Sequence, residues 1–112
     1  MTDVPRFVRR DLFGGRGEVA ISDLLGADAA PPFTAVLDCE LEAGGRVGVH
    51  LQEHYPEIVV CTGGAGWVEL DGARHAFAPG QMIYLPLGST LALECAEGAP
   101  LRYLIIKAAL KA

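Results

Sequence analysis

The stretch that decides the fold runs from Gly44 to Cys95, GGRVGVHLQEHYPEIVVCTGGAGWVELDGARHAFAPGQMIYLPLGSTLALEC. Glycines and prolines divide it into short apolar runs, which is typical of strands joined by turns. The pair Asp71-Gly72 stands between two such runs, and this is the strongest short-range signal for a β-hairpin. About eight short strands with turns at near-regular spacing predict an all-β sandwich or double-sheet barrel.

Working outward from this stretch, the same pattern continues on both sides. Alternation of apolar and polar residues predicts a strand over Phe33–Leu41. Residues 1–32 are expected to form an irregular N-terminal arm that packs on a barrel of residues 33–112, with a short helical turn over 107–112. The expected strands are 18–24, 33–41, 47–52, 57–62, 67–70, 73–77, 82–85, 91–95 and 101–106.

Composition excludes several classes of function. The chain has 112 residues, enough for one domain, and a formal net charge of -5, with its nine Lys and Arg spread along the sequence. Nucleic acid is therefore not an expected partner. Without a long apolar run or a signal-peptide pattern, a membrane is not expected either, and we expect a cytoplasmic protein. Cys39, Cys61 and Cys95 are odd in number and lie in apolar runs, which favours buried thiols over disulfides.

Two spaced motifs run through the central stretch. Their spacing resembles the paired motifs of the cupin superfamily, G-x5-H-x-H-x3-4-E-x6-G and G-x5-P-x-G-x2-H-x3-N. The first corresponds to Gly44, His50, Gln52, Glu57 and Gly64, and the second to Gly80, Pro86, Gly88, Leu91 and Cys95. The resemblance covers residues 33–107 and implies a small single-domain cupin with a jelly-roll, or double-stranded β-helix, barrel.

The resemblance also implies a divalent transition metal, such as iron, manganese, nickel or zinc. The ligands would be His50, Gln52 and Glu57, while Leu91 stands where the family usually has a histidine. An amide oxygen is a weak ligand for these metals and leucine is none, so the metal motif is degenerate. His54 is a possible additional ligand if its loop folds inward. Two interpretations stay open, either a weakened metal site or a metal-free buried polar network of the same three residues.

The second motif predicts one wall of a cavity. Leu91, Leu93 and Cys95 share one face of a strand, so they are expected to line the cavity, although Cys95 also fits the core. An apolar wall favours a small hydrophobic or amphipathic ligand. The functional hypothesis is a small-molecule-binding cupin, which with a metal in the weakened site would be an enzyme of the oxygenase, isomerase or lyase type, with no catalytic residue assigned. The alternative is a non-catalytic metabolite-binding or sensor cupin without metal.

A homodimer is the expected assembly. The apolar strand 101–106 and the N-terminal arm would pair across a two-fold axis, as the resemblance to cupins implies. Such an assembly is compatible with either functional hypothesis and does not separate them.

Overall fold

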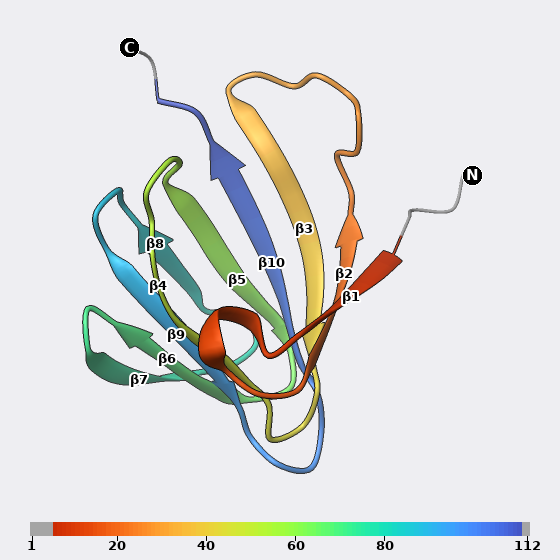
Figure 1. Ribbon diagram of the computed structural model, residues 1–112, viewed down its shortest axis with the longest axis vertical. Coiled ribbons are helices and arrows are strands. Elements are labelled where there is room, and N and C mark those ends of the chain that lie inside the picture. Colours follow the sequence, from red (N-terminus) through yellow and green to blue (C-terminus); the bar gives the residue numbers. More distant parts are fainter. Residues whose placement is uncertain (1–5, 111–112) are drawn as a thin grey trace.

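The protein folds into two antiparallel sheets that face each other, as Figure 1 shows for the computed structural model. The structure describes residues 6–110. One sheet has six strands in the order β1-β2-β3-β10-β5-β8, and the other has four in the order β4-β9-β6-β7. The elements are β1 (Arg6–Arg10), the 3-10 turn η1 (Leu12–Gly14), β2 (Glu18–Asp23), β3 (Phe33–Leu41), β4 (Arg46–Leu51), β5 (Glu57–Gly63), β6 (Gly66–Leu70), β7 (Ala73–Phe77), β8 (Met82–Leu85), β9 (Thr90–Cys95) and β10 (Leu101–Ala108). The predicted all-β jelly-roll class is confirmed.

The hairpin predicted at Asp71-Gly72 joins β6 to β7. Leu70 and Ala73 are paired across it, and both central residues have positive φ, 48° at Asp71 and 86° at Gly72. Two successive residues with positive φ define the tight turn that matches the twist of the flanking strands. Local sequence alone therefore determines this connection.

The N-terminal segment is more regular than the sequence predicts. Instead of an irregular arm, β1 and β2 extend the six-stranded sheet, and β2 pairs with β3 from Val19 to Asp23. The strand β1, RFVRR, is short, basic and exposed at every position, so its own residues give little strand signal. It is held by pairing with β2, in which Phe7 lies opposite Ile21.

The C-terminal strand is longer than predicted. Lys107 and Ala108 were expected to be helical but belong to the strand β10. Residues 111–112 lie outside the described residues. The strand β10 pairs with β3 on one side and with β5 on the other. Two sets of ladder hydrogen bonds override the helical preference of this Ala- and Leu-rich tail.

The hydrophobic core fills the space between the sheets at the end where β10 begins. Its largest buried side chains include Leu41, Phe77 and Leu101. The three cysteines are buried and unpaired, and burial raises the pKa of each thiol, that of Cys39 to about 12. They are protonated core residues. Within residues 6–110 no helix has the length and hydropathy needed to cross a membrane.

Candidate functional site

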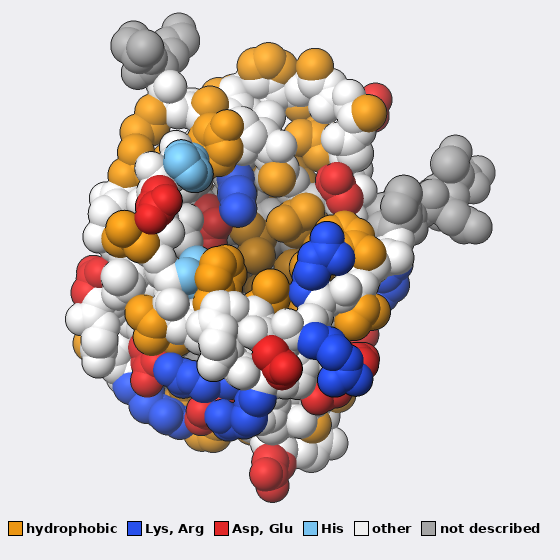
Figure 2. Space-filling view, viewed as in Figure 1, with side chains coloured by type: hydrophobic (Ala, Val, Ile, Leu, Met, Phe, Trp, Pro, Cys, Tyr) orange, Lys and Arg blue, Asp and Glu red, His pale blue; other side chains and the backbone are white. Residues whose placement is uncertain are grey.

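A cavity of about 780 Å³ opens between the two sheets and is lined in part by residues of the hydrophobic core. Figure 2 shows it as a hollow with a mainly apolar floor and with basic, acidic and histidine side chains around it. The N-terminal segment forms one wall through Phe7, Leu12 and Phe13, which the sequence does not single out. Most small-molecule sites have volumes of about 300–1,000 Å³ and are mainly apolar with a few polar groups.

A β-bulge turns His50 toward the cavity. In the ladder between β4 and β9, Val47 lies opposite Leu93 and His50 lies opposite Leu91. Three residue steps on β4 thus match two on β9, so β4 contains one extra residue. Without it, strict alternation from Val47 would send His50 to the outer face. The bulge places His50 on the same face as Leu91.

The imidazole of His50 is fixed from two sides. Its Nδ1 lies 3.0 Å from the carbonyl oxygen of Gly48, and its ring stacks on Phe13 with centroids 4.1 Å apart and an interplanar angle of 13°. A carbonyl only accepts, so Nδ1 carries the proton and Nε2 keeps its lone pair. Burial lowers the pKa of His50, the bond to Gly48 opposes this, and the charge of Lys107 adds to it.

Phe13 reaches His50 through a strained turn. Asp11 and Phe13 both have positive φ, 51° and 54°, a conformation that disfavours residues other than glycine. The turn packs backbone to backbone on β4, because Arg16 and Arg46 exchange two hydrogen bonds of 2.8 Å. A Cβ atom at Gly48 would overlap the carbonyl oxygen of Phe13, so only glycine fits there.

Gln52 follows directly after β4. Its backbone is fixed by hydrogen bonds of 2.9 Å with Ser89 and Gly88 of the second motif. Its side chain is only 7% exposed and lines the cavity. Within residues 6–110 the amide group forms no side-chain hydrogen bond. Gln52 therefore presents a donor and an acceptor to the cavity.

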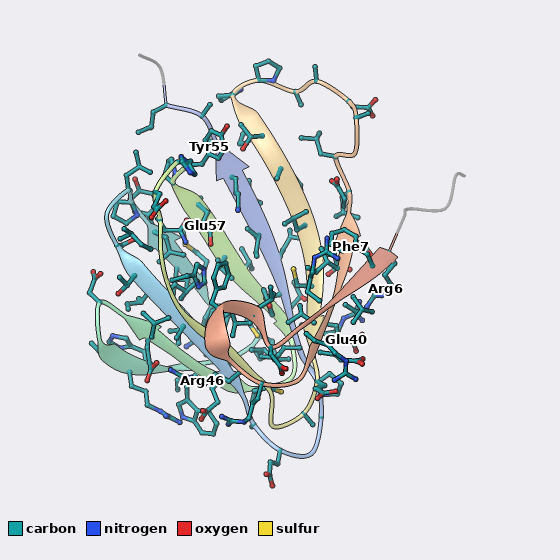
Figure 3. The ribbon with its side chains drawn as sticks, viewed as in Figure 1. Arg6, Phe7, Glu40, Arg46, Tyr55 and Glu57 are labelled. Atoms are coloured by element: carbon teal, nitrogen blue, oxygen red, sulfur yellow. The ribbon has the colours of Figure 1, made fainter. Side chains whose placement is uncertain are left out.

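Glu57 and Lys107 form the charged part of the site. They are opposite each other in the ladder between β5 and β10, and their Oε2 and Nζ atoms are 3.8 Å apart. The side chain of Glu57 is 3% exposed and that of Lys107 is 36% exposed. Burial raises the pKa of Glu57, and the charge of Lys107 partly offsets that effect. Figure 3 shows Glu57 at the same end of the barrel as Tyr55.

Tyr103 forms part of the cavity floor. It comes from β10, two residues from Ile105 on the same inner face, and is 2% exposed. Burial raises the pKa of its phenol, which therefore stays protonated. No hydrogen bond to this hydroxyl is present in the described part of the chain. Tyr103 and Lys107 belong to neither motif, and only the pairing of β10 with β5 could have revealed them.

The remaining predicted site residues are spread over three environments. Leu91 and Leu93 line the cavity as an apolar wall. Cys95 is buried outside the cavity lining, where its thiol donates to the carbonyl oxygens of Ala96 and Ala99 at 3.2 and 3.1 Å. His54 lies at the rim with its side chain 82% exposed, and its Nε2 is 3.9 Å from the Glu53 carboxylate.

Comparisons with known proteins identify the fold. No protein-family model matches the sequence, and no curated protein matches it. Among solved structures, a predicted oxalate decarboxylase from Thermotoga maritima is 23% identical with a TM-score of 0.89, covering 96% of this chain and 95% of that one. The chain has the cupin fold. The cupin-2 domain protein from Rhodospirillum rubrum (17% identity, TM-score 0.80, covering 97% and 72%) and the polyketide cyclase RemF from Streptomyces resistomycificus (17%, 0.76, 95% and 74%) share it.

The donor set of this cavity does not fit a stable metal site. Within residues 6–110 no group of three His, Cys, Asp or Glu residues is placed to hold a metal ion. Leu91, opposite His50, offers no ligand atom. The ammonium group of Lys107 lies beside Glu57 and supplies the positive charge that a cation would otherwise bring. His50, Gln52 and Glu57 are thus better suited to hydrogen bonding than to metal coordination.

Proposed function

We propose that this cupin binds a small, mainly apolar organic molecule in its cavity, with the polar part of the ligand held by His50, Gln52, Glu57 and Tyr103. Apolar side chains form most of the cavity wall, and polar groups from both sheets reach into it. This combination is typical of sites in which apolar contact gives affinity and a few polar groups fix the orientation.

The observation that carries the proposal is the state of Gln52 and Tyr103. Both side chains are more than nine-tenths buried and line the cavity, yet neither has a hydrogen-bond partner within residues 6–110. Among residues 6–110 no fully enclosed side-chain nitrogen or oxygen lacks a partner, so the polar atoms of Gln52 and Tyr103 are accessible from the cavity and free to bond a ligand or water. A ligand that displaces water from the cavity would form hydrogen bonds with both groups.

We assign the binding role without a resident transition metal. His50 presents a neutral imidazole with Nε2 as an acceptor, and Glu57 presents a buried carboxyl group beside Lys107. The solved structures that share the fold have names as different as decarboxylase and cyclase, so the fold does not select a reaction. A non-catalytic metabolite-binding or sensor protein is the function that these residues support best.

The test is a titration followed by ¹H–¹⁵N NMR in the presence of EDTA. The probe is ethylbenzene, an apolar molecule small enough for the cavity. Saturable shifts at the amides of Leu91, Leu93 and Tyr103 are expected. Leu93→Trp, which fills the cavity from its apolar wall, should abolish them, whereas Trp67→Leu on the four-stranded sheet, outside the cavity lining, should leave them unchanged.

Two results would contradict the proposal. Absence of saturable binding up to the solubility of ethylbenzene would remove the binding function. Copurification of about one equivalent of transition metal, with binding seen only when EDTA is left out of the titration, would replace it with the metal-dependent enzyme. Elemental analysis of protein purified without chelator decides the second point.

We also propose that two copies of this chain associate through the outer face of the six-stranded sheet. Residues between the cavity-facing ones on each strand point outward. One cross-strand row on this outer face is Tyr84, Ile58, Ile106 and Val36, and the next contains Met82, Val60 and Leu104. The outer face of an antiparallel sheet is usually polar, so seven adjacent apolar residues favour a covered surface.

The charges beside these rows favour a second copy as the partner. Arg6 pairs with Glu40 at 3.0 Å and Arg102 with Asp38 at 3.6 Å. Positive and negative charges beside the apolar rows therefore cancel, which does not favour a strongly charged partner. The outer faces of two identical sheets can pack face to face, as the layers of a β-sandwich do. Sedimentation should give a dimer for the wild type and for Ala76→Glu, at an exposed position of β7 in the four-stranded sheet, and a monomer for Met82→Glu/Tyr84→Glu. A monomeric wild type, or a dimeric double variant, would contradict this assembly.

A further inference from the structure

We propose that Lys107 is the ligand-orienting residue of the cavity and that its ammonium group donates to an uncharged carbonyl oxygen of the bound molecule. This inference rests on the proposed binding function and names the chemical class of the ligand, an apolar compound that carries a ketone, aldehyde or amide carbonyl. Lys107 lies outside both sequence motifs, near the end of β10.

The ammonium group of Lys107 has free donors. Its only ionic partner among residues 6–110 is Glu57, and the Nζ–Oε2 distance of 3.8 Å is too long for a hydrogen bond. An ammonium carries three N–H donors. The side chain is partly open to the cavity, so a ligand atom can approach Nζ without displacing a protein group.

Lys107 is close to the other polar groups of the cavity. Its charge adds to the lowering of the pKa of His50 and opposes the rise that burial gives the pKa values of Glu57 and Cys39, and these three residues come from three different strands. Glu57 is its direct neighbour across the ladder, and Tyr103 lies on the same face of the same strand. A ligand oxygen near Nζ would therefore lie beside Glu57, while the rest of the molecule extends along the cavity toward Tyr103 and the apolar wall.

The neighbouring Glu57 decides which oxygen is bound. A carboxylate ligand would place a second negative charge close to the buried carboxyl group of Glu57, and like charges in such a site repel strongly. A carbonyl oxygen accepts from Lys107 without that repulsion. The phenol of Tyr103 is a second donor on the same face, and Gln52 can donate through its amide nitrogen.

The test compares three probes of similar size, ethylbenzene, acetophenone and benzoate, by NMR titration of the full chain. The variant Lys107→Met removes the ammonium and keeps an unbranched apolar side chain. Its matched control is Arg102→Met, which removes a cation from the outer face of the same strand, where Arg102 pairs with Asp38. Lys107→Gln replaces the methionine variant if the latter does not give a folded spectrum.

Lys107→Met should weaken acetophenone binding about tenfold and leave ethylbenzene binding within about twofold, since a hydrogen bond from a charged donor is lost. Arg102→Met should change neither, and benzoate should bind more weakly than acetophenone to the wild type. Equal acetophenone affinity in wild type and Lys107→Met would overturn the inference, as would tighter binding of benzoate. Failure of all three probes, ethylbenzene included, would instead overturn the proposed binding function itself.

Discussion

The two walls of the cavity differ in the residue that faces each polar side chain of the first motif. On the four-stranded sheet, His50 lies opposite Leu91, so a polar group faces an apolar one. On the six-stranded sheet, Glu57 lies opposite Lys107, so a buried acid faces a cation. One wall has no ligand where the paired cupin motifs have a histidine, and the other wall carries its own positive charge.

Two independent features of this barrel thus oppose metal binding. Leu91 removes a ligand atom, and Lys107 adds a competing charge near a remaining one. Because they lie on different sheets and come from β9 and β10, each can be changed without disturbing the pairing of the other. The contribution of each sheet to metal affinity can therefore be tested separately.

The largest effect is expected from restoring the missing ligands. Gln52→His/Leu91→His gives three imidazoles with Glu57, and zinc or nickel affinity should rise by at least about a hundredfold over the wild type, judging from the free energy that structural zinc gains per ligand. Isothermal titration with either metal measures it. The matched control is Gln52→His/Leu93→His, in which an equally buried leucine two residues away on the same face is replaced. Equal affinities in both double variants would show that position 91 is not part of a latent site.

A smaller effect is expected where the bulge meets the N-terminal turn. Gly48→Ala places a methyl group against the carbonyl oxygen of Phe13, and the free energy of unfolding should fall by about 2–3 kcal/mol, as in overpacked cores. Urea unfolding measures it. Ala92→Gly, at a buried position of the adjacent strand β9, is a control for a single methyl change and should cost less, about 1 kcal/mol. A neutral Gly48→Ala would mean that the turn is not packed on β4.

The barrel was largely predictable because its signals are local. The Asp71-Gly72 turn, the alternation over Phe33–Leu41 and the motif glycines each specify their own neighbourhood, and the structure confirms the all-β jelly roll. The strand β1 was missed because its five exposed residues are held only by their partner strand. The helical tail was predicted wrongly at Lys107, where two neighbouring strands override local propensity.

The cavity was less predictable because it depends on register and packing. The sequence indicated His50, Gln52 and Glu57, and the structure brings them to one cavity. It could not indicate Lys107, which becomes a partner of Glu57 only through the pairing of β10 with β5. Phe13 was equally hidden, because a residue at positive φ in an apparently irregular arm has no sequence signal for stacking on a histidine.

The two walls should also respond oppositely to pH. The folded-state pKa of Glu57 is raised by burial, so above the unfolded value of 4.5 the native state retains a proton that the unfolded state releases, and stability falls as pH rises through that window. The folded-state pKa of His50 is lowered by burial, so below 6.5 the unfolded state binds a proton that the native state refuses, and stability falls as pH falls.

Unfolding free energies of Glu57→Gln and His50→Gln across pH 4 to 8, measured with urea, should separate these slopes. Glu57→Gln should gain relative to the wild type as pH rises from the acid end, and His50→Gln should gain as pH falls below neutrality. The rim variant His54→Gln exchanges one solvated side chain for another and serves as the reference. Slopes of the opposite sign would mean that the charged forms of Glu57 and His50 are favoured in the folded barrel.

The smallest effect is expected at Phe13, which covers His50 from the N-terminal turn. Phe13→Ala removes a stacked ring and should lower the free energy of unfolding by about 1 kcal/mol. Phe13→Gly removes the same ring but accepts a φ of 54°, so it should be more stable than Phe13→Ala by about 1 kcal/mol. In both variants the imidazole is less covered, and NMR titration should show the pKa of His50 moving back up toward its ordinary value. If Phe13→Ala equals Phe13→Gly in stability, the turn carries no strain, and the stacking of Phe13 on His50 needs no distorted backbone to hold it.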